Sequence, residues 1–94
     1  MIDSADILRD PPAMLAKLCA ALGIAWDPAM LRWETGLRDT DGIWASHWYD
    51  AVMSSTGFGA PDKPLPALDA EAAAVAEACR PGYDYLARYK IPLS

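Results

Sequence analysis

Apolar residues in the first quarter of the chain recur every three or four positions, which is the spacing of a helix with one buried face. They are Met14, Leu15, Leu18, Cys19 and Leu22. Asp10 before Pro11 and Pro12 is typical of a helix start, because its carboxylate accepts a main-chain N–H and the prolines lack one. Gly23 supplies the left-handed residue that ends such a helix, with Ile24 after it in a Schellman arrangement.

The same signals recur in the middle of the chain. Asp27 followed by Pro28 predicts a short helical turn that ends before Thr35 and Gly36. A third helix is expected over residues 43–53, with Asp41 as its cap. One side of that helix carries apolar residues that we interpret as a core face: Trp44, Trp48, Ala51 and Val52.

The last third begins with a Pro/Gly-rich internal loop over residues 55–68, where prolines disfavour helix. Asp69 then predicts the start of an alanine-rich helix, because Ala has the highest helix propensity. Pro81 and Gly82 are expected to kink or end this helix near Arg80, after which a helical pattern continues toward Lys90.

These patterns predict a mainly α fold of four to five helices, with residues 1–94 as a single small helical domain. Residues 1–9 are interpreted as a brief extended segment, which leaves room for one short N-terminal strand. A domain of this length buries only about 60% of its unfolded surface, so dimerisation or docking on a larger body would add to its stability.

The formal net charge of −5 and the lack of a basic run argue against nucleic acid and anionic membranes as partners. No apolar stretch approaches the roughly 20 residues of a membrane span, and the N-terminus is acidic where a signal peptide is basic. We therefore expect a cytoplasmic protein. Cys19 and Cys79 are expected to be reduced and buried, and a single histidine with no close cysteine pair predicts no metal site.

Known catalytic motifs are absent: the sequence has no GxxxxGK[ST] or GxGxxG phosphate loop, no GxSxG, no HExxH and no CxxC. We assign no catalytic residue. Residues 36–58 concentrate a glycine-rich turn, Arg38, the only histidine (His47) and several aromatic rings. Arg38 on a turn that leads into a helix is a reasonable anion site, although pairing with Asp39 or Asp41 is the plainer interpretation. His47 is more simply a structural histidine than a catalyst.

Three stretches resemble the C-terminal region of bacterial and plant P-loop sulfotransferase-like proteins. They read LCAALGIAWDPAMLRWETG, then DGIWASHWYDAVMSSTGF, then EACRPGYDYL. The resemblance extends over nearly all of the chain and is most specific in the second stretch. It implies transfer of a sulfuryl group from 3′-phosphoadenosine-5′-phosphosulfate to an acceptor hydroxyl or amine.

The resemblance also implies binding roles for three residues. Family members place an Arg- and Gly-containing loop late in the chain, where it holds the 3′-phosphate and adenine side of the donor. Arg38, Gly42 and Trp44 occupy similar places, although Asp39 and Thr40 replace the Lys-Gly that follows the arginine. The phosphate loop and the catalytic base of the family would lie upstream of this sequence.

Two functions from different classes follow. The first is a C-terminal, non-catalytic part of a sulfotransferase-like protein, which binds no cofactor by itself and completes a site only with a P-loop portion. The second is a stand-alone helical interaction module that self-associates, or binds a protein partner, through Trp44 and Trp48. A weaker third interpretation is a nucleotide-binding regulator that uses Arg38 and the aromatic rings.

Overall fold

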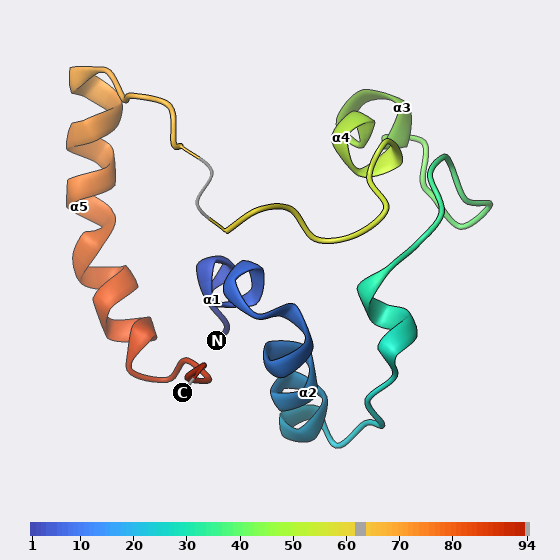
Figure 1. Ribbon diagram of the computed structural model, residues 1–94. Helices are drawn as coiled ribbons and strands as arrows, with labels where there is room; N and C mark the ends of the chain where they lie inside the picture. The colour runs from blue at the N-terminus through green and yellow to red at the C-terminus, as the bar shows by residue number, and fades with distance from the viewer. Residues whose placement is uncertain (62–63, 94) are drawn as a thin grey trace.

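Helices joined by extended segments make up the chain, as the mainly α prediction requires. The computed structural model describes residues 1–61 and 64–93 (Figure 1). The elements are α1 (Ser4–Arg9), α2 (Pro11–Leu22), the 3-10 helix η1 (Pro28–Leu31), α3 (Ala45–Trp48), α4 (Asp50–Met53) and α5 (Ala70–Ala87). Within the described residues, β pairing is limited to an isolated antiparallel bridge between Arg32 and Gly57. No helix in that part of the chain combines the length and apolar character needed to cross a bilayer.

The expectation of an extended N-terminal segment is wrong, because residues 4–9 form α1. Asp3 caps this helix: its Oδ1 accepts the Ala5 N–H at 3.0 Å. Asp6 then pairs with Arg9 one turn later, at 3.2 Å. A cap and an ion pair within one turn favour a helix over a strand that would have no neighbour to pair with.

Helix α2 begins and ends where the sequence predicts. The Asp10 carboxylate accepts the Ala13 N–H at 3.2 Å. At the other end Gly23 has φ of 70°, and its N–H reaches the Ala20 carbonyl at 3.2 Å while the Ile24 N–H reaches the Cys19 carbonyl at 3.0 Å. This pair of bonds is the Schellman motif. The caps at Asp27 and Asp69 are confirmed in the same way, by bonds to Ala29 and Ala72.

The predicted helix over residues 43–53 is divided into α3 and α4 by Tyr49. Asp41 does not cap it; the Asp41 carboxylate accepts the Arg38 N–H at 2.9 Å instead. The core interpretation of this helix is also wrong within this chain, because Trp44 and Trp48 are exposed. Among the described elements α3 packs only on α4, so nothing here covers the indole rings.

Helix α5 continues through Pro81 to Ala87 and does not end near Arg80. The proline ring leaves the carbonyl four residues earlier, at Glu77, without its helical N–H partner. Cys79 lies on this helix as an exposed free thiol, which corrects the expectation that both cysteines are buried; Cys19 is buried and free.

The C-terminal end of α5 is held against α1 by polar contacts, which we call the terminal latch. The Tyr83 hydroxyl donates to Asp3 Oδ2 at 2.6 Å. Lys90 Nζ lies 3.3 Å from Asp6 Oδ2, on a carboxylate that is largely buried. The main chain adds a bond from the Ile91 N–H to the Met1 carbonyl at 3.0 Å. The two ends of the chain therefore lie side by side (Figure 1).

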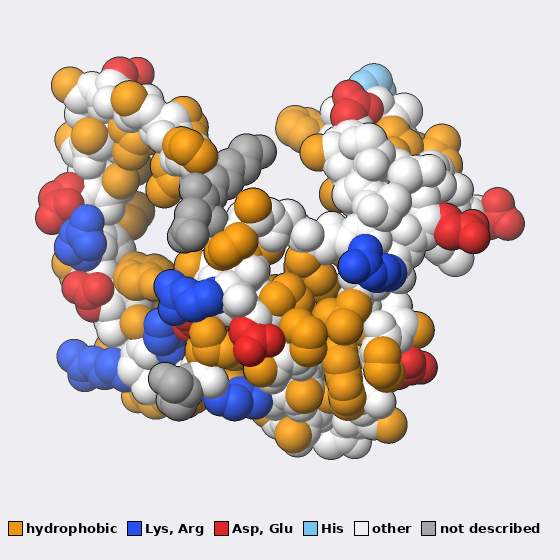
Figure 2. Space-filling view, in the orientation of Figure 1, with side chains coloured by type: hydrophobic (Ala, Val, Ile, Leu, Met, Phe, Trp, Pro, Cys, Tyr) orange, Lys and Arg blue, Asp and Glu red, His pale blue; other side chains and the backbone are white. Residues whose placement is uncertain are grey.

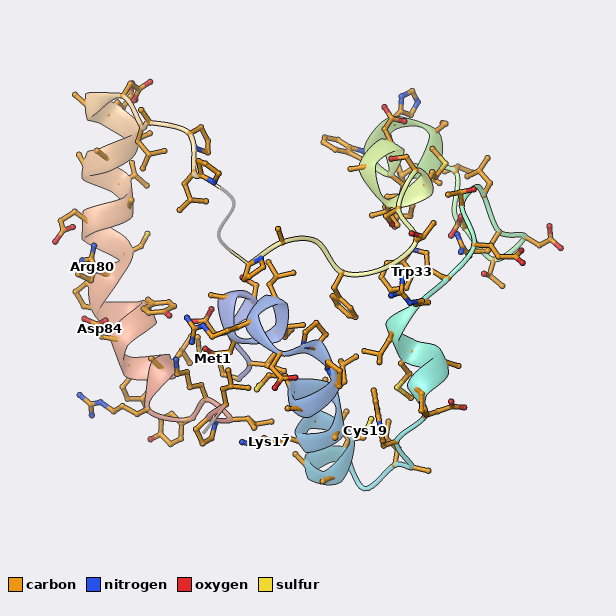
Figure 3. All side chains as sticks on the ribbon, in the orientation of Figure 1. Met1, Lys17, Cys19, Trp33, Arg80 and Asp84 are labelled. Carbon is orange, nitrogen blue, oxygen red and sulfur yellow. The ribbon has the colours of Figure 1, made fainter. Side chains whose placement is uncertain are left out.

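A second contact ties the chain end to α2. Lys17 Nζ donates to the Pro92 carbonyl at 2.7 Å and also to the Leu93 carbonyl (Figure 3). The terminal latch and Lys17 hold α5 and the chain after it only from Tyr83 onward. The first turns of α5 stand apart from the other helices (Figure 1).

Among the described residues, few apolar side chains are buried, two on α2 and one on α3. Met14, Cys19 and Ala45 are the buried apolar residues of the described chain. The Cα radius of gyration is 16.2 Å, against about 12 Å for a compact chain of this length. The accessible surface is 7574 Å², against about 5,300 Å² for a compact monomer of this mass. Figure 2 shows hydrophobic side chains spread over the visible face.

Candidate functional site

The segment that carries the candidate residues is closed at its base by two antiparallel stretches, 32–36 and 53–57, which we call the stem. The main-chain pairings are Arg32 with Gly57, Trp33 with Thr56, and Gly36 with Met53. The latter two are N–H to carbonyl bonds of 3.0 and 2.7 Å. The three pairings keep one register, so residues 37–52 emerge from the stem as a single closed loop.

Side chains brace the stem at Trp33, which is partly buried. Its indole N–H donates to Ser55 Oγ at 2.9 Å, and Ser55 Oγ donates in turn to the Val52 carbonyl at 2.6 Å. The Phe58 ring meets the Trp33 ring edge to face, with centroids 5.5 Å apart and planes at 81°. This is a favoured aromatic geometry. Trp33 therefore joins both stretches of the stem (Figure 3).

Two glycines allow the stem to close. Gly36 has φ of 101°, a conformation that side chains disfavour. A Cβ on Gly57 would stand 3.2 Å from the Leu31 carbonyl oxygen, which is a tight contact. The sequence indicates both glycines as turn residues. The structure shows that Gly36 is needed for its backbone conformation and Gly57 for its close approach to Leu31.

Arg38 lies at the start of the loop with its guanidinium folded back on the stem. Its Nη1 donates to the Gly36 carbonyl at 2.7 Å, and its Nη2 donates to the Glu34 carbonyl. Its main-chain N–H donates to Asp41 Oδ2 at 2.9 Å. The guanidinium is thus anchored by carbonyls and not by the carboxylate of Asp39 or Asp41.

A hollow of about 230 Å³ lies beside this arginine. It is lined by Trp33, Gly36, Arg38, Asp41, Tyr49, Val52 and Met53. Of the three predicted binding residues, only Arg38 lines it. Gly42 is exposed outside it, and Trp44 lies against His47, with ring centroids 6.3 Å apart and planes at 54°. The structure does not bring Arg38, Gly42 and Trp44 together at one hollow.

The charges in the hollow decide what it can bind unaided. The lining contains one guanidinium, that of Arg38, and one carboxylate, that of Asp41, so the formal charges cancel. A nucleotide with a 3′-phosphate and a 5′-phosphosulfate carries several negative charges and needs several donors. The residues present therefore do not fit 3′-phosphoadenosine-5′-phosphosulfate without further cationic groups.

The framework of the hollow was missed by reasoning from sequence. The sequence predicts a helical turn at Trp33 and a loop that includes Ser55 and Phe58. The available signal was the pair of glycines, Gly36 and Gly57, one on each side of the third helix. Short pairings of this kind leave little periodicity to detect, because each stretch is under six residues long.

Comparison with known proteins identifies the family. The model of a sulfotransferase domain matches residues 1–88. The chain therefore belongs to the sulfotransferase-domain family, which confirms the resemblance seen in its sequence.

Two relatives from Arabidopsis thaliana are far longer than this chain. Branched-chain-amino-acid aminotransferase-like protein 2 is 40% identical over 91 residues, which are 92% of this chain and 15% of that protein. Branched-chain-amino-acid aminotransferase-like protein 1 is 43% identical over 63 residues, or 67% of this chain and 11% of that protein. No solved structure matches. The chain thus corresponds to a minor part of each relative.

Proposed function

We propose that this chain is the C-terminal, non-catalytic part of a sulfotransferase-like protein. It would complete a site for 3′-phosphoadenosine-5′-phosphosulfate and an acceptor only together with a portion that carries a phosphate-binding loop. The family match supports the chemistry. The sequence itself has no GxxxxGK[ST] loop that would hold the phosphates.

The observation that carries this proposal is the surface left uncovered by the fold. The chain exposes about 2,300 Å² more than a compact monomer of its mass would. Exposed apolar side chains contribute to that excess at α3, α4 and α5. Large apolar surfaces on a small chain mark places where another body packs.

In the assembled unit, Arg38 would supply one group of the anion site. A guanidinium has five N–H donors. Two of its nitrogens donate to main-chain carbonyls, which hold the head of the side chain at the edge of the hollow while leaving other donors for an anion. The cations that offset Asp41 would come from the P-loop portion.

Titration with 3′-phosphoadenosine-5′-phosphate tests the proposal. Calorimetry on the chain alone should give no binding heat, and a mixture with a recombinant P-loop sulfotransferase portion should bind the nucleotide. Arg38→Ala should weaken binding by the mixture, whereas Arg80→Ala, an exposed arginine on α5 paired with Glu77, serves as the matched control. Nucleotide binding or sulfuryl transfer by the chain alone would overturn the proposal. An in-frame phosphate-loop sequence upstream in the DNA would support it independently.

The exposed tryptophans also favour a second candidate, a stand-alone interaction module. Trp44 and Trp48 are both uncovered on α3 and its N-terminal cap. Sedimentation at several concentrations separates the two candidates. Reversible dimers without any affinity for a P-loop portion would favour the module.

We also propose a cytoplasmic setting. Cys79 is an exposed free thiol, and free thiols of this kind persist where the compartment is reducing. Labelling of Cys79 by a thiol reagent in intact cells, compared with purified protein, would test this.

A further inference from the structure

The most exposed aromatic surface of the molecule lies around α3. Ile43, Trp44 and Trp48 form what we call the tryptophan patch, with 85%, 63% and 75% of their surfaces exposed. The Trp48 N–H donates to the Trp44 carbonyl at 3.1 Å, one helical turn back. Residues four apart on a helix lie on the same side of it, which places Trp44 and Trp48 on one side of α3.

Composition and position make this patch suited to docking. Tryptophan is among the residues most enriched at the energetic centres of protein interfaces. The patch is held by a closed loop rather than by a free end, since the stem fixes both ends of residues 37–52. Because both ends of the loop are fixed, the patch loses less conformational freedom on binding than a free chain end would, which favours affinity.

The charges around the patch argue against a second copy of this chain as its occupant. The loop that carries the patch, residues 37–52, contains three aspartates, which we call the acidic rim: Asp39, Asp41 and Asp50. Its one basic residue is Arg38, whose guanidinium is folded back on the stem. A two-fold contact would place the same acidic rim against itself, and like charges across an interface disfavour association. The rim instead fits a partner whose apolar face is bordered by basic side chains.

We propose that the tryptophan patch is the surface through which this chain docks on the P-loop portion of a sulfotransferase unit. This inference rests on the function proposed above and names its contact surface. The two relatives contain much more chain than this one, since the aligned part is 15% and 11% of their lengths. A portion that binds anionic phosphates would carry basic side chains, which is the charge that the acidic rim calls for.

Binding measurements on two patch variants and one control test the proposal. The probe is a recombinant sulfotransferase portion that carries the phosphate loop, titrated with purified chain in a calorimeter. Trp48→Ser and Trp44→Ser should each weaken binding by about 30-fold or more, as expected of hot-spot residues. Leu65→Ser is the matched control, because Leu65 is 91% exposed but lies outside the patch, and it should bind as the wild type does. Circular dichroism should be unchanged for all three, since none of these side chains is buried.

The outcomes separate this inference from the function on which it rests. Failure of the wild-type chain to bind the P-loop portion would overturn both. Wild-type binding that is unaffected by Trp44→Ser and Trp48→Ser would overturn the docking surface and leave the proposed function standing. A concentration-dependent dimer that the patch variants abolish would show that a second copy is the occupant, which also overturns the inference.

Discussion

At the scale of single residues, the closed loop depends on backbone conformations that only glycine adopts easily. Gly36 has φ of 101°, and its N–H pairs with Met53 at the inner end of the stem. Placing a Cβ in left-handed backbone costs about 1–2 kcal/mol. Gly36→Ala should therefore destabilise the stem by about that amount.

Chemical denaturation, followed by the NMR signal of the Trp33 indole N–H, measures this effect. Gly59→Ala is the control, because a Cβ there meets nothing within 4 Å and the φ of Gly59 is not positive. A Gly36→Ala variant as stable as Gly59→Ala would contradict the role given to this backbone conformation.

Several helix caps and one helix end were predictable because the hydrogen bonds that form them join residues within one turn. Asp10, Asp27 and Asp69 cap helices and Gly23 ends one, because each bond joins neighbours in sequence. The environment of the tryptophans was not predictable in the same way. Burial depends on distant elements, and an apolar face at helical spacing looks the same in the sequence whether or not another body covers it.

At the scale of elements, α5 is attached through the terminal latch, whose groups titrate at both ends of the pH range. The hydrogen bond from Tyr83 lowers the pKa of Asp3 below its ordinary 3.8, and the same bond raises the pKa of Tyr83 above 10.0. The hydrogen bond to Asp6 raises the pKa of Lys90 above 10.5.

The signs follow from linkage between protonation and folding. Because the pKa of Asp3 is lower in the folded chain, its ionised carboxylate stabilises the latch above about pH 3.8. This stabilisation is lost as the pH falls through the pKa of Asp3 in the folded chain. Because the pKa values of Tyr83 and Lys90 are raised in the folded chain, their protonated side chains stabilise the latch below about pH 10. This stabilisation is lost as the pH rises through the pKa values of these two residues in the folded chain.

We therefore expect the Ile91 N–H, which bonds Met1, to lose its protection from hydrogen exchange below about pH 3.8 and above about pH 10. Tyr83→Phe should return the Asp3 pKa toward 3.8 in a carboxyl NMR titration, because the donated hydrogen bond is gone. Tyr85→Phe is the matched control, since the Tyr85 ring instead packs on Tyr89. An Asp3 pKa unchanged by Tyr83→Phe would contradict the latch.

Replacing the proline inside α5 is expected to stabilise the helix. Pro81 lies inside the helix, where proline costs about 3 kcal/mol relative to alanine. Pro81→Ala should increase helicity and raise the melting temperature, with a gain of up to about 3 kcal/mol. Pro66→Ala, in the segment before α5, should leave helicity unchanged. Lower helicity in Pro81→Ala would show that the proline positions α5.

Element boundaries were predicted less well than element types. Helices were expected near α2, η1, α3–α4 and α5, and all are present. The division at Tyr49, the continuation past Pro81 and the helical start at Ser4 were missed. The start at Ser4 depends on a cap and an ion pair within one turn, so its signal was present in the sequence. The division at Tyr49 lies in the loop closed by the stem, and the stem pairs residues about 20 positions apart, which short-range pattern does not encode.

At the scale of the whole molecule, the chain buries too few apolar side chains to be compact. Its core has three buried apolar residues in the described part, while the tryptophan patch and most of α5 face outward. An open arrangement of this kind is consistent with a piece that completes its packing on another body. The size of the isolated chain in solution is therefore its most informative property.

Small-angle X-ray scattering of the isolated chain, extrapolated to zero concentration, tests this claim most directly. We expect a monomer of 10.2 kDa with a radius of gyration near the 16.2 Å of the Cα trace. A monomer near 12 Å, the value for a compact chain of this length, would contradict it, because the chain would then cover its own apolar surface and need no partner.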